Sequence, residues 1–289
     1  EGMARAAMSP PRNPEVIEGF LADLDYDGYQ RIRFDPERAR WREPDVGFRL
    51  SAFHLGWLFE TPVHLFEVVD GQSRPMTFGT QDFDYSSLES VEIPADTPMP
   101  EEFPRFSDFW LERPQPGAET LTLYAALESQ SVTGAYRFII RPGTDTQIDV
   151  TARLYLRNDI EQLGIAPLTS MFLYGGADAG EFDDFRPAVL DSEALVLTTR
   201  AGATIYRPLN NPPRLASSYF GAMSPKSFGL VQRTRDFSEY LDAEAHYEKR
   251  PTLMVEPLGD WGEGTVRLVE IPSKLEANDN IVAYWIPDV

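Results

Sequence analysis

Short runs of alternating apolar and polar residues recur along most of the chain. The clearest covers residues 148–156, where every second side chain from Ile148 to Leu156 is apolar and Asp149, Thr151 and Arg153 lie between them. This pattern is typical of a half-buried strand in an antiparallel sheet. Similar extended runs lie at residues 29–34, 48–58, 62–69, 120–127, 136–141, 166–174 and 194–199. Many short strands separated by turn residues predict an all-β fold, specifically a large antiparallel β-sandwich with a few short helices.

Two segments have apolar residues at helical spacing instead. They are Glu15–Leu24 and Asp236–Glu248, and in the second Asp236 and Glu239 are spaced like a capping box. We therefore predict an N-terminal segment with a short helix at residues 1–25. One β-sandwich domain then follows over residues 26–289.

The segment Leu268–Pro287 combines two strand-like flanks with an unusual loop. The flanks are rich in Val, Ile and aromatic residues, and the loop Glu276–Asn280 contains two carboxylates and two amides but no glycine. One interpretation is an Asx-type turn, in which the side chains bond their own backbone. The other is a loop that binds a polyhydroxylated ligand, and the local sequence does not separate the two.

Composition excludes several classes of partner. The chain has 289 residues, a formal net charge of −20 and no cysteine. Because phosphate backbones need Lys and Arg to neutralise them, we predict no nucleic-acid partner. No apolar run approaches the roughly eighteen residues of a membrane span, so we predict no membrane insertion. The three histidines lack metal-ligand spacing, and we predict neither a metal nor a cofactor.

Three blocks mix aromatic, charged and amide side chains: residues 101–114, residues 184–192 together with 205–212, and residues 228–237. Aromatic faces stack on pyranose rings, while Arg and Asn bond hydroxyl groups, so these blocks suit a neutral sugar polymer. Taken alone, each block is more often explained by surface ion pairs, core packing or a simple turn. The predicted substrate-binding residues from these blocks and the loop are Trp110, Arg186, Tyr206, Arg207, Asn210, Arg233, Asn278 and Trp285.

An ordered set of sequence strings carries a family resemblance. In chain order they are EEFPRFSDFWLERP, TGAYRF, RPGTDT, APLTSMFLYG, YRPLNNP, SFGLVQRTRDF, LVEIP and NDNIVAYW. Together they resemble the amino-terminal domain of the periplasmic glucan biosynthesis proteins of the MdoG, OpgG and OpgD type. The resemblance implies a sandwich like the galactose-mutarotase fold, a periplasmic location and a role in making osmoregulated periplasmic glucans.

The same resemblance implies a chemistry. Some members of the family act as endo-β-1,2-glucanases that invert the anomeric centre, which requires a general acid and a general base about 6.5–9.5 Å apart, or further if waters relay the proton. The resemblance places the acid on the loop at 276–280, and we assign it to Asp279 with Glu276 as its supporting carboxylate. We assign the base to Asp191, with Glu256, Asp260 and Asp184 as competing carboxylates.

Two departures from the family pattern keep a second function open. Family members usually carry a second, immunoglobulin-like carboxy-terminal domain, which we expect to be absent here, and a longer family segment corresponds here only to Phe78–Met99. Residues 1–13 also lack the apolar core of a signal peptide. The alternative function is a non-catalytic periplasmic glucan-binding protein. A mutarotase-like epimerase rests on fold analogy alone, and whether the chain forms a homodimer is left open.

Overall fold

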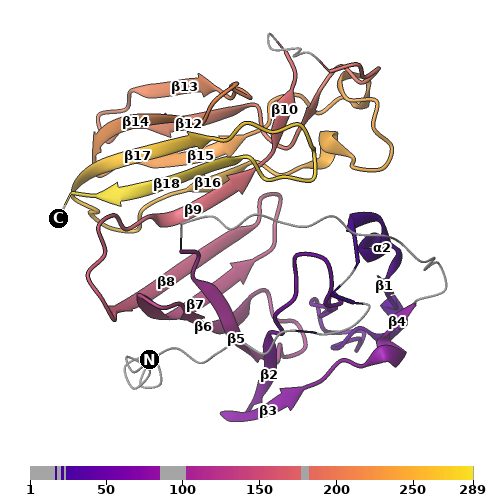
Figure 1. Ribbon diagram of the computed structural model, residues 1–289. Helices are drawn as coiled ribbons and strands as arrows, with labels where there is room; N and C mark the ends of the chain where they lie inside the picture. The colour runs from indigo at the N-terminus through magenta and orange to yellow at the C-terminus, as the bar shows by residue number, and fades with distance from the viewer. Residues whose placement is uncertain (1–16, 18–20, 23, 85–101, 177–181, 289) are drawn as a thin grey trace. The chain divides into compact units, whose positions relative to one another are not determined.

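Strands dominate the regular backbone, as the alternating pattern predicts. The computed structural model describes residues 17, 21–22, 24–84, 102–176 and 182–288. The chain divides into two compact units, unit 1 over residues 1–160 and unit 2 over residues 161–289 (Figure 1). The helical segments are short, and the all-β prediction is confirmed. The helix expected at Glu15–Leu24 lies largely outside the described residues.

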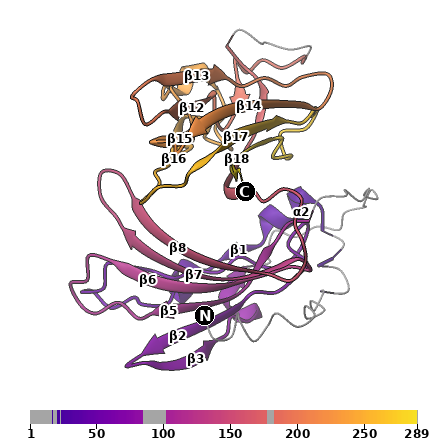
Figure 2. The same cartoon turned by 90° about the vertical axis from the view of Figure 1, so that its left-hand side faces the viewer.

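Within its described residues, unit 1 is built around a six-stranded sheet (Figure 2). In spatial order its strands are β3 (Gln72–Met76), β2 (His64–Val69), β5 (Arg105–Glu112), β6 (Leu121–Glu128), β7 (Val132–Arg141) and β8 (Gln147–Leu156). All neighbours are antiparallel except β2 and β5, which run parallel and therefore need a crossover connection. One face of the sheet packs on Trp41 and Val46.

The rest of the described part of unit 1 consists of short elements. They are α2 (Tyr26–Arg31), β1 (Arg33–Phe34), η1 (Pro36–Arg38), η2 (Thr80–Asp82) and β4 (Phe83–Asp84), where η denotes a 3-10 turn. The predicted strand at residues 29–34 is therefore wrong over most of its length. The Asp25 side chain accepts a hydrogen bond from the Gly28 backbone N–H at 2.7 Å and starts a helix there. The strand predicted at 48–58 is also wrong, because this segment forms only single bridges, Arg40 with Leu50 and Gly56 with Phe59.

Strand β8 has the predicted register, but its apolar face is not buried. It pairs with β7 so that Val150 lies opposite Phe138 and Ile148 lies opposite Ile140. Ile148, Val150 and Leu156 are nevertheless 51%, 45% and 46% exposed. Strand β8 is the edge of its sheet. The alternating pattern thus identifies the apolar face of a strand but not whether another layer covers that face.

Unit 2 forms a β-sandwich. Among the described residues, one four-stranded sheet has the order β13 (Thr204–Pro208), β12 (Ala194–Thr198), β15 (Ser227–Val231) and β16 (Leu253–Val255). The other has the order β14 (Ala216–Met223), β17 (Glu263–Glu270), β18 (Ile281–Pro287) and β9 (Ile165–Ser170). Side chains from both sheets, including Leu195, Phe228, Val266 and Ile281, share one buried core.

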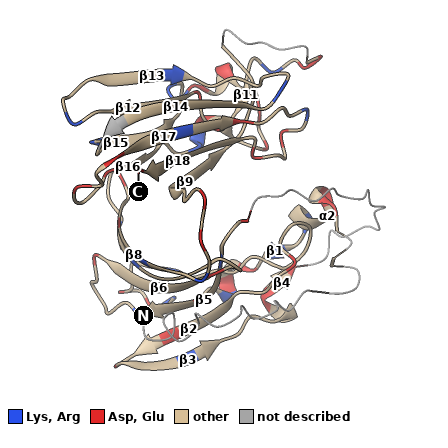
Figure 3. Cartoon of the chain, turned by 60° about the vertical axis from the view of Figure 1, so that its left-hand side comes forward, with Lys and Arg blue, Asp and Glu red and all other residues tan. Residues whose placement is uncertain are grey.

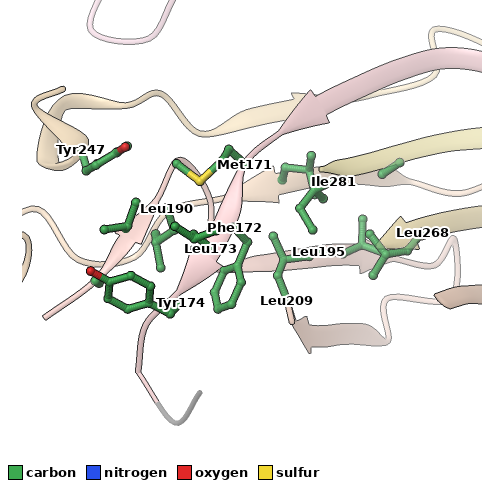
Figure 4. Packing of buried hydrophobic residues seen from close by; sticks show 14 of the residues in the cluster. Met171, Phe172, Leu173, Tyr174, Leu190, Leu195, Leu209, Tyr247, Leu268 and Ile281 are labelled. Atoms are coloured by element: carbon green, nitrogen blue, oxygen red, sulfur yellow. The ribbon is translucent and has the colours of Figure 1, made fainter. Parts of the chain in front are cut away.

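A short hairpin runs through the same core. It consists of β10 (Phe172–Tyr174) and β11 (Val189–Leu190), and every residue from Met171 to Tyr174 is buried. Figure 4 shows β10 inside the cluster, with Leu195 and Ile281 on neighbouring strands. Because β10 is surrounded by the packed core of unit 2, it gives a well-defined attachment point for the loops that bond to it.

The helix predicted at Asp236–Glu248 is wrong. The segment contains two 3-10 turns, η3 (Phe237–Glu239) and η4 (Tyr247–Lys249), and Asp236 makes no side-chain capping bond. Leu241 and His246 have left-handed backbone angles, with φ of 56° and 51°, which end a helix. Between them the Asp242 side chain accepts hydrogen bonds from the backbone N–H groups of Glu244 and Ala245, so a local turn replaces the helical bonds.

Candidate functional site

The loop between β17 and β18 is attached to β10 by an asparagine. Asn280 is buried, with an exposed fraction of 2%. Its Oδ1 accepts from the Phe172 N–H at 2.9 Å, and its Nδ2 donates to the carbonyls of Phe172 and Ile271 at 3.0 Å each. Asp279, the preceding residue, is exposed. The buried amide therefore fixes the backbone that carries an outward-facing carboxylate.

A second asparagine holds the other side of this loop. The Asn211 amide donates to the carbonyls of Leu173 and Ser273 at 3.0 and 2.8 Å, and its Oδ1 accepts from the Ser273 N–H at 3.0 Å. Both asparagines thus tie the loop to adjacent residues of β10. The Asn280 amide thus bonds backbone outside the loop rather than forming the Asx-type turn, and Asp279 is exposed; ligand binding by the loop stays a prediction.

Asp191 is placed beside the same strand. Its backbone N–H donates to the Met171 carbonyl at 2.8 Å, directly after β11. Burial raises the pKa of the Asp191 carboxyl, the Arg250 guanidinium lowers it, and the negative charge of Asp279 raises it again. Asp279 therefore lies close enough for its charge to act on Asp191. The two carboxylates assigned to one site from the sequence therefore lie in the same part of unit 2.

One carboxylate oxygen of Asp191 has an ion-pair partner but no hydrogen bond. Arg250 Nε lies 3.0 Å from Asp191 Oδ1 as an ion pair. Their alignment does not meet the geometry of a hydrogen bond, and among the described residues this buried Oδ1 has no hydrogen-bond partner. Asp191 also lines a small pocket of about 120 Å³, together with residues that include Ser170, Ser192 and Leu230. The pocket is polar and large enough for water.

A second carboxylate cluster surrounds Arg186, and it is fully paired. The guanidinium contacts Asp184 Oδ2 at 2.6 Å, Asp242 Oδ2 at 2.6 Å and Glu276 Oε2 at 2.9 Å. Arg186 holds the pKa of the Asp184 carboxyl well below its usual range. Burial opposes the same change at Asp242, but the Ala245 N–H and Arg186 outweigh it, so this pKa is also lowered.

Tyr247 connects this cluster with the neighbourhood of Asp191. Its hydroxyl donates to Glu276 Oε2 at 3.2 Å, and its ring lies 5.6 Å from the Arg250 guanidinium carbon. Burial, and after it the charge of Glu276, raises the pKa of the Tyr247 hydroxyl. Glu276 is expected from the sequence to support Asp279, and in the structure its carboxylate contacts Arg186 and Tyr247.

Three other predicted binding residues have structural partners. Arg207 Nη2 contacts Glu270 Oε2 at 2.8 Å, and the backbone N–H of Asn210 donates to Glu270 Oε1 at 2.8 Å. Glu270 is only 1% exposed, and burial raises its pKa against the opposing effect of Arg207. Arg233 forms a surface ion pair with Glu193 at 3.3 Å. These residues compensate charge within unit 2.

The last predicted residues fall into different environments. Tyr206 is 49% exposed on β13, and the Asn278 amide bonds Ser273 Oγ at 3.4 Å within its own loop. Trp285 is fully buried between the sheets, so we remove it from the substrate-binding set. Its ring requires glycine at position 264, because a Cβ there would lie 2.4 Å from the indole.

Trp110 belongs to unit 1. It stacks on Phe66 with ring centroids 5.6 Å apart and an interplanar angle of 12°. A trough of about 430 Å³ includes Trp110 and Tyr124 in its lining.

Sequence reasoning missed two residues near the carboxylates, Asp242 and Tyr247. Both lie in the segment interpreted as a helix, where the capping pattern hid the local turn.

Within the described ranges, no three His, Cys, Asp or Glu side chains converge in a way that could hold a metal ion. Acidic residues are distributed over both units (Figure 3). No helix among the described residues is long and apolar enough to span a membrane.

Comparison with known proteins gives a consistent result. A family model described as "Periplasmic glucan biosynthesis protein, MdoG" matches residues 1–97 and 90–289. A "Glucans biosynthesis protein G" from Cereibacter sphaeroides is 47% identical, over 100% of this chain and 63% of its own length. Its counterpart from Rhodopseudomonas palustris is 40% identical over 97% of this chain and 66% of its own length. A "Probable glucans biosynthesis protein D" from Shewanella oneidensis is 40% identical over 95% of this chain and 59% of its own length.

The chain thus spans just under two thirds of the length of these curated relatives. The alignment with the Cereibacter sphaeroides protein covers 342 residues against the 289 of this chain, so that relative has internal sequence without a counterpart here. The two matched stretches of the family model meet at residues 90–97, inside the short region at 78–99. On these matches, the chain belongs to the periplasmic glucan biosynthesis protein family, MdoG.

Proposed function

We propose that this chain acts in the periplasm on the backbone of a β-1,2-linked glucan and cleaves it by anomer-inverting endo-hydrolysis. The observation that supports the proposal is that Asp191 and Asp279 come from distant segments and are anchored at neighbouring residues: the Asp191 N–H bonds the Met171 carbonyl, and Asn280, next to Asp279, bonds Phe172. The family supports a role in glucan biosynthesis. The β-1,2 linkage and the location follow from the family resemblance.

In the proposed reaction, Asp279 is the general acid and Asp191 the general base. Asp279 donates its proton to the glycosidic oxygen as the bond from that oxygen to the anomeric carbon breaks. Asp191 accepts a proton from a water molecule whose oxygen attacks the same carbon from the opposite face. One water is consumed, one reducing end forms with inverted configuration, and proton exchange with solvent restores both carboxyl groups.

The surroundings of each group suit its role. Asp279 is exposed at the end of a fixed loop, where a polymer can reach it. Asp191 has a raised pKa, which makes it a stronger proton acceptor, and its residue lines a polar pocket. Glu276 then acts as a positioning residue, since Arg186 and Tyr247 fix its carboxylate on the Asp279 loop.

The test is release of new reducing ends from a linear β-1,2-glucan. The wild-type protein should produce them, and Asp279→Asn should slow the reaction by about 10²–10⁴-fold, the usual contribution of an acid catalyst. Asp288→Asn, an exposed carboxylate near the chain end, is the matched control and should retain full activity. Undiminished product from Asp279→Asn would remove Asp279 from the mechanism.

A specific observation favours the second candidate, a non-catalytic glucan-binding protein. Relatives contain internal sequence that this chain lacks, and the family match divides within the short region at 78–99. If that sequence completes the site, glucan binds without being cleaved. Binding of the wild-type protein to the glucan with no new reducing ends would establish this candidate over the hydrolase.

A further inference from the structure

The face of the unit 1 sheet opposite its core carries a continuous row of side chains. Strand register places Phe66, Trp110, Tyr124, Arg137 and Thr151 opposite one another on β2, β5, β6, β7 and β8. Residues opposite each other on neighbouring strands point to the same face. Four strand spacings of about 4.8 Å give this row a span of about 19 Å.

The neighbouring row on the same face has smaller side chains at its centre. It contains Asp108, Ala126, Ala135 and Arg153 at successive register positions. Two alanines in the centre leave space beside the larger rings, and the trough of about 430 Å³ lies there. Its lining includes Trp110, Tyr124, Ala126, Ala135, Arg137 and Arg153. The sheet therefore presents a shallow groove with an aromatic side, a small-residue floor and guanidinium groups at one end.

Both aromatic rings are held in place before any ligand arrives. Trp110 stacks on Phe66, nearly parallel at 12°. The Tyr124 hydroxyl donates to Glu112 Oε1 at 3.0 Å, while Tyr124 itself is 38% exposed. A fixed ring loses little conformational freedom on binding, so its stacking energy is retained in the affinity.

We propose that this trough is a glucan-binding site of unit 1, which binds several consecutive sugar units by stacking on Trp110 and Tyr124. A pyranose ring offers an apolar face to an aromatic plane and a rim of hydroxyl groups to Arg137. The span of the row suits an oligosaccharide chain rather than a single sugar. The net charge of −20 disfavours a polyanion, and the polar end of the trough disfavours a purely apolar partner.

This site rests on the proposed function for the identity of its ligand, but not on the carboxylates of unit 2. Sugar bound in the trough needs no acid or base, and every group that lines it belongs to unit 1. Binding in the trough and cleavage in unit 2 are thus separable in variants. The trough would increase the time that a polymer spends on the protein.

The experiment measures glucan affinity in an Asp279→Asn background, where turnover does not interfere. Linear β-1,2-gluco-oligosaccharides are titrated calorimetrically, and tryptophan fluorescence is followed in parallel. Adding Trp110→Ala or Tyr124→Ala should weaken binding about tenfold, the loss expected for one stacked ring. Phe53→Ala, which removes a 92% exposed ring of unit 1 outside the trough, should leave affinity within about twofold.

Two further variants distinguish the loss of a binding contact from unfolding of the sheet. Tyr124→Phe keeps the ring and should keep binding, whereas Ala126→Gln fills the floor and should abolish it without removing any contact of the core. Circular dichroism and thermal melting confirm that each variant is folded. Weakened binding in the folded Tyr124→Ala and Ala126→Gln variants supports the site even where Trp110→Ala does not fold.

The outcomes separate this inference from the proposed function. If the trough variants bind as tightly as their background while the wild-type protein still cleaves glucan, the trough is not a binding site and the hydrolase proposal is untouched. If wild-type protein binds glucan through the trough but produces no reducing ends, the trough is supported and the hydrolase proposal fails. If wild-type protein does not bind the glucan at all, the trough is not a glucan-binding site and the inference is overturned.

Discussion

Two groups of carboxylates in unit 2 differ in how their charge is compensated. Asp184, Asp242 and Glu276 share the guanidinium of Arg186 at 2.6–2.9 Å, and the pKa values of Asp184 and Asp242 are lowered. Asp191 has one ion pair without hydrogen-bond alignment, a like charge nearby in Asp279, and a raised pKa. A paired cluster of this kind stabilises a fold, whereas an incompletely compensated pair can accept and donate protons.

The largest expected effect separates the two groups by activity. Asp191→Asn should slow glucan cleavage by about 10²–10⁴-fold, since it removes the proposed base. Asp184→Asn alters only the paired cluster and should leave the rate within about tenfold of wild type in protein shown to be folded. Initial rates of reducing-end formation measure both. Equal losses in the two variants would show that the paired cluster and Asp191 do not differ in their contribution to cleavage.

The next effect concerns stability of the paired cluster. Arg186→Met leaves Asp184 and Asp242 partly buried without their counter-charge and should lower the free energy of unfolding by about 3 kcal/mol. Urea denaturation followed by circular dichroism measures the change. Arg186→Lys is the matched control and should recover part of the loss, because lysine keeps the charge but not the planar fork of donors. A stable Arg186→Met protein would show that the cluster is not needed for the fold.

A smaller effect tests the loop attachment. Asn280→Ala removes three hydrogen bonds and leaves the Phe172 N–H without its acceptor, so we expect a loss of about 2 kcal/mol. The loop that carries Asp279 should also become less well positioned, which lowers the cleavage rate more than it raises the KM. Asn278→Ala, whose amide makes one long bond at the loop surface, serves as the control and should change little.

The smallest expected effect concerns stability: the contributions of Asp184 and Asp191 to the free energy of unfolding change in opposite directions with pH. The folded-state pKa of Asp184 is lowered, so its stabilisation is present above the unfolded value near 4 and is lost as pH falls through the folded value. Asp184→Asn should therefore cost stability at pH 7 and progressively less in acid. The pKa of Asp191 is raised, so its ionisation in the folded state opposes folding as pH rises.

Asp191→Asn should accordingly gain stability relative to wild type between acid and neutral pH. Thermal melting of both variants and wild type, from about pH 3 to pH 7, measures the two trends. Trends of the same sign in both variants would contradict the contrast between a compensated and an uncompensated carboxylate.

Much of the fold could be predicted from local pattern, because strands are specified by alternation. The strands at 120–127, 136–141 and 148–156 were identified from sequence within a few residues. Residues 236–248 were not, since the competing bonds of the Asp242 side chain are visible only in the folded chain. The burial of Trp285 could have been predicted from the alternation of its strand, because Ile281, Ala283 and Trp285 are all buried on one face.

The candidate site was predictable only in part. The Asp279 loop was identified from its excess of polar groups between two strands, and Asp191 through the family resemblance. Their positions depend on the start of β10, where Phe172 bonds the Asn280 side chain and the preceding Met171 bonds the Asp191 backbone. No spacing in the sequence indicates that both segments attach to one buried strand, and the roles of Arg250 and Tyr247 follow from the same tertiary arrangement.

The most direct test of the central claim follows the anomeric configuration of newly formed reducing ends. Linear β-1,2-glucan is incubated with wild-type protein, and proton NMR spectra are recorded before mutarotation is complete. Water activated by Asp191 on the face opposite the leaving oxygen predicts that the α-anomer forms first and that Asp191→Asn forms neither anomer. Initial formation of the β-anomer, or undiminished cleavage by Asp191→Asn, would contradict a pair of carboxylates acting by inversion.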